Sequence, residues 1–303
     1  MKTVVCHFFN EEHLLPWWLD HHKKIFDHGI MINYHSTDRS CEIIKEICPT
    51  WQIRPSRNGY FTPKDIDAEV MDIEAMLTDW RICLNVTEFL YGNTDHLVSK
   101  PGNKFQYILA NYVFVDMEDP AKGPIHLLHD KPLHEQRYWG YFAPDYPNKE
   151  PNFSRMAPNR LNRAMHNFTI PYDDNGRHYP DTVHMFDDLA IFYYGHADIS
   201  EAGIKRKEQI KSKVANEYKS GHHHRNYGQF VSEIQNRHRP KSVDLTEKIK
   251  HICSYQYPDE NSTVVIDEPI QNVTELAVTY EGTVVEIPAT NSNLIQAEPR
   301  VIG

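Results

Sequence analysis

The stretch TVVCHFFNEEHLLPWWLDHH, residues 3–22, decides the fold, because a strand pattern gives way within it to a helix pattern. Residues 3–8 form an apolar run rich in β-branched and aromatic side chains, which predicts a strand. Pro16 suits the first turn of a helix, and apolar residues recur from there at helical spacing as far as Phe26. The chain is therefore expected to start with a strand, a short polar loop and a helix.

The same alternation continues through the first fifty residues. Residues 30–33 predict a second strand, and residues 41–48 predict a second helix that Pro49 ends. Strands that alternate with helices are typical of a parallel sheet with crossover helices. Further along, the patterns predict helices at residues 66–79, 199–221 and 226–237, and strands at residues 80–86 and 187–195. Residues 105–115 predict either one strand or a hairpin pair.

These patterns predict an α/β fold over residues 1–240, with a mostly parallel, Rossmann-like sheet flanked by helices. After about residue 257 the composition shifts to Thr, Val, Glu and Asn, and no helical period is visible. Residues 241–303 are therefore expected to form a C-terminal extension that is either β-structured or loosely ordered.

The composition limits the partners that the chain is expected to have. Its 303 residues are 40% hydrophobic and carry a formal net charge of −10, which argues against a broad nucleic-acid-binding surface. The odd number of cysteines, 5, indicates reduced thiols and a cytoplasmic setting. No apolar run approaches the roughly 20 residues of a membrane helix, so no integral membrane segment is expected.

Polar side chains follow three of the predicted strands. Asn10 and Glu11 come after the first strand, residues 36–38 (STD) after the second, and residues 85–88 (NVTE) after a later one. Each cluster alone has the composition of an ordinary turn or helix cap. Open parallel sheets bind their ligands beyond the carboxyl ends of the strands, so the three clusters together predict one shared ligand site.

In three places the chain resembles a branch of glycosyltransferases with the GT-A fold, which comprises family-2-like and family-92-like enzymes. FFNEEHLLPWWLDHH (residues 8–22) is similar to that branch's N-E-x-x-x-L-x-x-W-L-x-x-H opening, and INYHSTDRS (residues 32–40) to its D-N-x-S-x-D-x-S. WRICLNVTEFL (residues 80–90) is similar to W-x-x-x-x-D-x-D-E-F-L. The resemblance covers roughly residues 3–95. It continues faintly to about residue 235, through the segment FYYGHADISEAGIKRK.

The resemblance implies a transferase that moves a sugar from a nucleotide-sugar donor to an acceptor hydroxyl on a glycan, a lipid-linked glycan or a protein glycan. It places the base and ribose of the donor at the first two loops, where Asn10, Glu11, Asn33 and Asp38 are the matching positions. It places the diphosphate at the third loop, residues 85–88, where a divalent metal such as Mn²⁺ or Mg²⁺ neutralises the leaving nucleotide.

The chain departs from the branch at its acidic positions. Asn33 replaces the first acidic residue of the second loop, and Asn85 and Thr87 replace both aspartates of D-x-D, so Glu88 is the only carboxylate left there. Neutral oxygens bind a divalent cation weakly. Two alternatives follow: Glu88 holds a metal weakly, with the donor's diphosphate supplying most of the oxygens, or Lys and Arg side chains take over the charge role.

Other charged residues offer alternative phosphate or metal contacts. Two further carboxylate strings are Asp65 with Asp67, before a predicted helix, and Asp116 with Glu118 and Asp119, after a predicted strand. The candidate cations for a phosphate contact are Arg160, Arg163, Lys205, Arg206 and Lys207. Consecutive His222, His223 and His224 invite a metal interpretation, but neighbouring side chains point in different directions.

An inverting transferase also needs a general base beside the acceptor hydroxyl. Asp187 and Asp188, which precede an apolar strand late in the domain, are the candidate catalytic residues. His184 and His196 flank that strand and His166 precedes it, but in a chain with 19 histidines any one of them is more often a packing or surface residue.

The leading function is therefore glycosyl transfer. The alternative is a catalytically inactive GT-A-like protein that binds a nucleotide or glycan without turnover, an idea motivated by the missing aspartates. A third possibility, an unrelated nucleotide-binding α/β enzyme, has no support from a GxGxxG or GxxxxGK[ST] motif.

Overall fold

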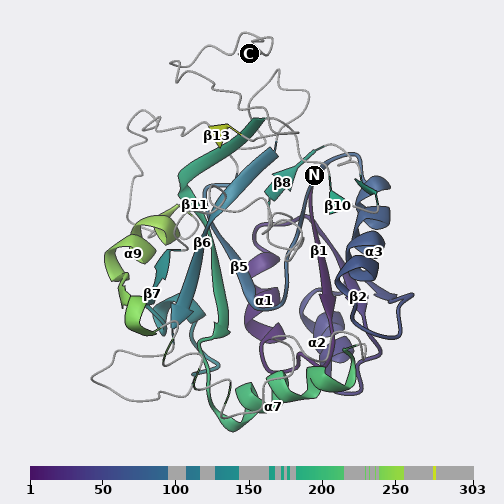
Figure 1. Ribbon diagram of the computed structural model, residues 1–303, viewed down its shortest axis with the longest axis horizontal. Coiled ribbons are helices and arrows are strands. Elements are labelled where there is room, and N and C mark those ends of the chain that lie inside the picture. The colour runs from purple at the N-terminus through teal and green to yellow at the C-terminus, as the bar shows by residue number, and fades with distance from the viewer. Residues whose placement is uncertain are drawn as a thin grey trace.

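The computed structural model describes residues 1–94, 107–116, 127–142, 164–167, 172–173, 176–177, 182–214, 229, 232, 236, 239–255 and 276–277. Its centre is a mixed β-sheet with helices on both faces (Figure 1). The first half follows the expected alternation, with β1 (Lys2–Phe8), α1 (Leu15–His22), β2 (His28–Asn33), α2 (Ser40–Ile47), β3 (Gln52–Pro55), α3 (Pro63–Ala75) and β4 (Trp80–Cys83).

The second half of the chain extends the same sheet. Its main strands are β5 (Glu88–Gly92), β6 (Tyr107–Asp116), β7 (Trp139–Phe142), β8 (Ala164–His166) and β11 (Thr182–His196). The helix α7 (Glu201–Gln209) follows β11, and β12 (Val243–Asp244) and α9 (Thr246–Ser254) come later. Short pieces complete the described elements: η1 (Leu133–Glu135), β9 (Tyr172–Asp173), β10 (Gly176–Arg177), η2 (Ile210–Ser212), η6 (Arg239–Lys241) and β13 (Leu276–Ala277).

The strand directions bring several carboxyl ends to one edge of the sheet. β3, β2, β1 and β4 are neighbours in that order and all run parallel. β8 runs antiparallel to both β4 and β6, so β6 has the same direction as β4, and β11 pairs parallel with β6. The carboxyl ends of β1, β2, β3, β4, β6 and β11 therefore lie at the same edge, and α7 runs along it (Figure 1).

Both faces of the first strands are buried. Val4, Cys6 and Phe8 of β1 belong to the apolar cluster that includes α1 and α2, whereas Val5 packs with Ile66 and other residues of α3 on the opposite face. Successive side chains of a strand point to opposite faces, so a strand covered on both sides needs a continuous apolar run. This explains why residues 3–8 show no polar alternation.

Two residues of the first motif attach α1 to the turn between β4 and β5. The indole Nε1 of Trp18 donates to the backbone oxygens of Asn85 at 3.1 Å and Glu88 at 2.9 Å. His22 Nδ1 donates to the Trp18 carbonyl at 2.9 Å, and His22 Nε2 accepts from the Leu90 N–H at 3.2 Å. This pattern requires the neutral tautomer with the proton on Nδ1. The motif therefore positions the third loop.

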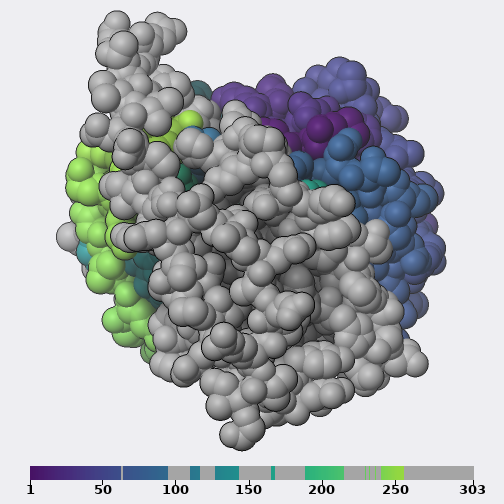
Figure 2. Space-filling model, turned by 90° about the horizontal axis from the view of Figure 1, so that it is seen from above, coloured from purple at the N-terminus to yellow at the C-terminus, as the bar shows by residue number. Residues whose placement is uncertain are grey.

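The chain continues to pack on the sheet beyond residue 240, where the C-terminal extension was expected to begin. β12 pairs antiparallel with β7, and α9 buries Ile249, Ile252 and Cys253 in the main apolar cluster. These positions, spaced three and four residues apart, form one face of a helix, which packs on β5 and β11. In Figure 2, α9 in yellow-green and the N-terminal elements in purple and blue lie on opposite sides of the molecule. Residues 241–255 therefore belong to the same domain.

The expected fold class is confirmed as far as an α/β domain whose sheet is flanked by helices. The sheet is parallel in its first half and mixed beyond β4. All five cysteines are free thiols. Among the described residues, no helix combines the length and apolar character that a membrane crossing requires. The helix expected at residues 199–221 is shorter, and the one expected at 226–237 lies mostly outside the described residues.

Candidate functional site

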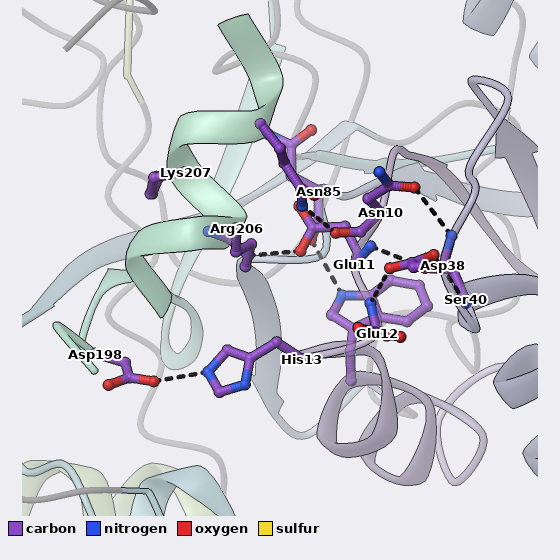
Figure 3. Close-up of polar contacts among 12 residues, drawn as sticks. Asn10, Glu11, Glu12, His13, Asp38, Ser40, Asn85, Asp198, Arg206 and Lys207 are labelled. Atoms are coloured by element: carbon purple, nitrogen blue, oxygen red, sulfur yellow. Dashed lines mark hydrogen bonds and ion pairs between the residues drawn. The ribbon is translucent and has the colours of Figure 1, made fainter. Parts of the chain in front are cut away.

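Asn10 joins the first loop to the second loop. Its backbone has φ 51°, and that of His35 has φ 59°, both in the left-handed region that few non-glycine residues adopt. The Asn10 N–H donates to Ser36 Oγ at 3.0 Å, and its Oδ1 accepts from the Thr37 N–H at 2.7 Å. Figure 3 shows Asn10 facing the segment that carries Asp38. The two loops are therefore fixed side by side beyond β1 and β2.

The remaining predicted residues of these loops shape the backbone around Asn10. Asp38 accepts from the backbone N–H of Glu12 and of Ser40, each at 3.0 Å. Asn33 Oδ1 accepts from the Ser36 N–H at 2.8 Å, which closes the turn after β2. The structure thus brings Asn10, Asn33 and Asp38 close to Glu11, whose N–H donates to Ser40 Oγ at 2.8 Å. The oxygens of Asn10, Asn33 and Asp38 hold the conformation of the two loops.

The third loop places its surviving carboxylate inward. Glu88 is 1% exposed. Its Oε2 accepts from the Asn85 N–H at 2.8 Å, and its Oε1 accepts from the Tyr112 hydroxyl at 2.9 Å. The Thr87 carbonyl in turn accepts from the Tyr194 N–H at 2.8 Å, which fixes the loop to β11. Glu88 therefore stabilises the β4–β5 turn and the neighbouring strand β6.

The residues at the D-x-D position do not fit a divalent metal. A hard cation needs several charged oxygens, whereas Asn85 and Thr87 are neutral and the Glu88 carboxylate is buried in two hydrogen bonds. Within the described ranges, no group of three or more His, Cys, Asp or Glu side chains is arranged to hold a metal ion. The expected Mn²⁺ or Mg²⁺ stays a prediction from sequence, and no step proposed below depends on it.

The helix α7 is fastened to the first loop by a buried ion pair. Arg206 Nε lies 2.6 Å from Glu11 Oε2, and the two residues are 5% and 7% exposed. Burial raises the pKa of the Glu11 carboxyl, while the Arg206 guanidinium opposes that shift. Gln209, one turn further along α7, donates to the Asn10 carbonyl at 2.5 Å. Figure 3 shows Arg206 reaching from α7 toward Glu11.

A second cation of α7 lies near the third loop. Lys207 Nζ is 3.3 Å from the Tyr193 hydroxyl and 5.7 Å from the centre of its ring. Tyr193 is the residue of β11 that pairs with Glu88, so Lys207 contacts the strand that lies beside the third loop. Of the cations proposed from sequence, Arg206 is engaged with Glu11 and Lys205 is exposed, whereas Arg160 and Arg163 lie outside the described residues.

The first loop also contributes an imidazole–carboxylate pair. His13 Nε2 lies 2.7 Å from Asp198 Oδ2, just after the carboxyl end of β11. Ser200 donates to Asp198 from both its N–H and its hydroxyl, each at 2.8 Å. Burial raises the pKa of Asp198, but the hydrogen bonds from His13 and Ser200 outweigh it and lower the pKa to about 2. Sequence reasoning missed both residues. The position of Asp198 directly after a strand was the available signal.

The structure does not bring the predicted catalytic residues Asp187 and Asp188 to this edge. Both lie within β11, where Leu189 pairs with Gly92, the last residue of β5. A Cβ on Gly92 would lie 1.9 Å from the Asp188 carbonyl oxygen, which places Asp188 beside that end of β5. Tyr193, opposite Glu88, is five residues further along, or roughly 16 Å at the usual rise of a strand.

The other candidates are distributed over the fold. The Asp65 N–H donates to the hydroxyl of Thr62, which caps the N-terminus of α3, and Asp67 is buried on the same helix. Asp116 ends β6 at the site's edge and accepts from Ser242 at 3.1 Å. His196 is also at this edge, whereas His166 is buried opposite Arg81 near the start of β4. The side chain of His184, and residues Glu118, Asp119 and His222–His224, lie outside the description.

Comparison with known proteins assigns no family to the chain. No protein-family model and no curated protein matches the chain. Among solved structures it is similar to S. aureus TarS 1–349, at 9% identity and TM-score 0.37 over 78% of this chain and 71% of that one. The TarS complex with UDP-GlcNAc aligns at 11% identity and TM-score 0.29, over 42% of this chain and 37% of that one. Likeness at this level assigns no activity, ligand or site to the chain.

Proposed function

We propose that the protein is a glycosyltransferase that moves a sugar from a nucleotide-sugar donor to a hydroxyl of a glycan, lipid-linked glycan or protein-glycan acceptor. The observation that carries the proposal is the junction at Asn10, which hydrogen-bonds the second loop and α7. The third loop follows β4, whose carboxyl end lies at the same edge of the sheet. Three motifs that resemble donor-binding loops of one enzyme branch thus lie at the edge where α/β sheets bind ligands.

The charge of the donor's diphosphate needs a positive partner in a chain whose net charge is −10. Lys207 is the described cation that supports this role best, because its ammonium group lies beside Tyr193, opposite the third loop. A fixed ammonium group stabilises charge that develops on the leaving nucleotide in the same sense as a metal would. We therefore assign the diphosphate to the space between the third loop and α7.

The experiment that tests the proposal is a screen of UDP-, GDP- and CMP-sugars for binding by calorimetry and for nucleotide release, with and without Mn²⁺. We expect one nucleotide class to bind and to be hydrolysed slowly in the absence of acceptor. Lack of binding by all three classes would refute a donor site at this edge.

A second candidate function is binding without turnover. It is favoured by the neutral Asn85 and Thr87 and by the buried carboxylate of Glu88, which together remove the charged ligands of a D-x-D metal site. The same screen separates the two candidates, because an inactive binder would bind a nucleotide sugar yet release no nucleotide over many hours.

A further inference from the structure

The pair formed by His13 and Asp198 has the features of a base and its orienting group. Asp198 is held by three donors, the His13 ring and the N–H and hydroxyl of Ser200, and its low pKa keeps it an anion. An anionic carboxylate accepts, so His13 Nε2 carries the proton that the bond requires. A neutral His13 then has its lone pair on Nδ1.

The second ring nitrogen of His13 is accessible. The only polar partner of His13 within the described part of the chain is Asp198, and Nδ1 is not among the buried unpaired atoms there. The His13 side chain is 14% exposed, whereas that of Asp198 is 7% exposed. The arrangement therefore buries the carboxylate, fixes the imidazole and leaves one basic nitrogen facing solvent.

His13 lies between aromatic side chains and the first loop at the same edge of the sheet. The ring of Trp17 meets the His13 ring edge-on at 5.9 Å, and the exposed His129 stacks on Trp17 at 4.5 Å. On the other side, Glu11 lies two residues away in the first loop with Arg206 against it. Flat side chains thus flank the imidazole on one side, and the donor-binding loops flank it on the other.

We propose that His13 is the general base that activates the acceptor hydroxyl, with Asp198 as the residue that positions it. This inference rests on the proposed glycosyl transfer. The acceptor oxygen attacks the anomeric carbon as the bond from that carbon to the diphosphate oxygen breaks. The hydroxyl proton passes to His13 Nδ1, and the electron pair of the broken bond leaves with the nucleotide diphosphate. Attack on the face opposite the leaving group inverts the anomeric configuration.

A structural role for the same bond makes a different prediction. If His13 only links the first loop to the segment before α7, a side chain that keeps the bond to Asp198 should suffice. Glutamine keeps an N–H donor for the Asp198 carboxylate but takes up no proton near neutral pH. The titratable groups that face His13 are Asp198 from the β11–α7 connection, Glu11 from its own loop and His129 from the segment at residues 127–131.

The test compares His13→Gln, Asp198→Asn and the control His251→Gln, which removes an exposed imidazole of α9. The readouts are the melting temperature, the dissociation constant of the nucleotide sugar found in the screen, and the rate of nucleotide release between pH 5 and 9. We expect His13→Gln to lower the rate at least about 100-fold with melting and donor binding unchanged. Asp198→Asn should lower the rate and leave the dissociation constant of the nucleotide sugar unchanged, because the imidazole loses the carboxylate that orients it.

The outcomes distinguish the base from the wider proposal. A His13→Gln variant that releases nucleotide at the wild-type rate would overturn the role of His13 and leave glycosyl transfer standing. Retention of the anomeric configuration, read by proton NMR of the freshly released sugar, would also overturn it. A wild-type protein that binds no nucleotide sugar, or binds one without release, would overturn the proposed transferase and the base with it.

Discussion

Arg206 and Glu11 are 195 positions apart in the sequence, and their side chains form a 2.6 Å ion pair that is almost closed to solvent. One belongs to the helix after the last long strand of the sheet, the other to the loop after the first strand. Their contact joins the segments that follow the first strand and the last long strand, at the edge where the candidate donor loops meet. The shape of this edge therefore depends on a contact that forms only when the whole sheet is assembled.

Removing one partner of this pair should cost more than removing an exposed pair. Arg206→Met leaves the Glu11 carboxylate buried beside an apolar side chain, and we expect a loss of about 3 kcal/mol in the free energy of unfolding. Arg39→Met, which breaks an exposed pair with Glu42, should change it by less than about 1 kcal/mol. Urea denaturation measures both. Equal effects of the two substitutions would show that the Glu11–Arg206 pair has no special role.

Lys207 and Lys205 provide a matched test of the diphosphate contact. Both are on α7, but Lys205 is exposed and Lys207 lies against Tyr193. We expect Lys207→Ala to weaken nucleotide-sugar binding about tenfold or more and Lys205→Ala to leave it within about twofold, because screening weakens an exposed charge. Calorimetric titration at two salt concentrations checks this. A stronger effect of Lys205→Ala would move the diphosphate away from the third loop.

Substitution of Glu88 should affect stability rather than metal binding. Glu88→Ala leaves the Asn85 N–H and the Tyr112 hydroxyl without their acceptor, and we expect a loss of about 2 kcal/mol or more. Tyr112→Phe removes one of the two bonds and should cost about 1 kcal/mol. The measurements are denaturant unfolding and titration with Mn²⁺. A Glu88→Ala protein that keeps its stability but loses Mn²⁺ binding would restore the metal interpretation.

The buried histidines of α1 predict a loss of stability in acid. Burial lowers the pKa of His21 to about 3 and that of His22 well below its usual range. Below about pH 6.5 these histidines become protonated in the unfolded chain but stay neutral in the folded chain. The free energy of unfolding therefore falls as the pH falls from about 6.5 toward 3. The slope is about 1.4 kcal/mol per pH unit for each proton. His21→Gln retains a donor for the Leu90 carbonyl and should reduce this slope, whereas His251→Gln should not. Identical slopes in the two variants and the wild type would contradict the assignment.

The local parts of the fold could be predicted from the sequence, and the pairings between distant segments could not. The alternation through α2 follows from hydrophobic spacing, which is a property of short windows. Glycine commonly ends helices, so the local pattern around Gly29 favours a helix end. Here it lies in β2, where a Cβ would come within 2.1 Å of the Trp51 ring. Glycine is needed at this strand position because the Trp51 ring packs against it. The residues around Gly29 in the sequence do not show that contact.

The candidate site was predictable only as far as it follows the strand ends. Asn10 and Asp38 were identified because they follow strands that the pattern predicts, and Asn33 because it matches a motif position of the resembling branch. Asp187 and Asp188 were chosen because an apolar run follows them, but β11 already includes both and continues to His196. The carboxylate of this segment that reaches the edge is therefore Asp198, after the end of β11. Its partner His13 comes from a loop 185 positions earlier, a contact that no local pattern contains.

Hydrogen exchange, read by mass spectrometry with and without the nucleotide sugar found in the screen, tests the central claim most directly, because it locates the donor on the fold. The account predicts slower exchange at residues 10–13, 36–38, 85–88 and 198–209, the three loops and α7. Protection confined to the opposite end of the sheet, at residues 76–80 and 182–188, would contradict it.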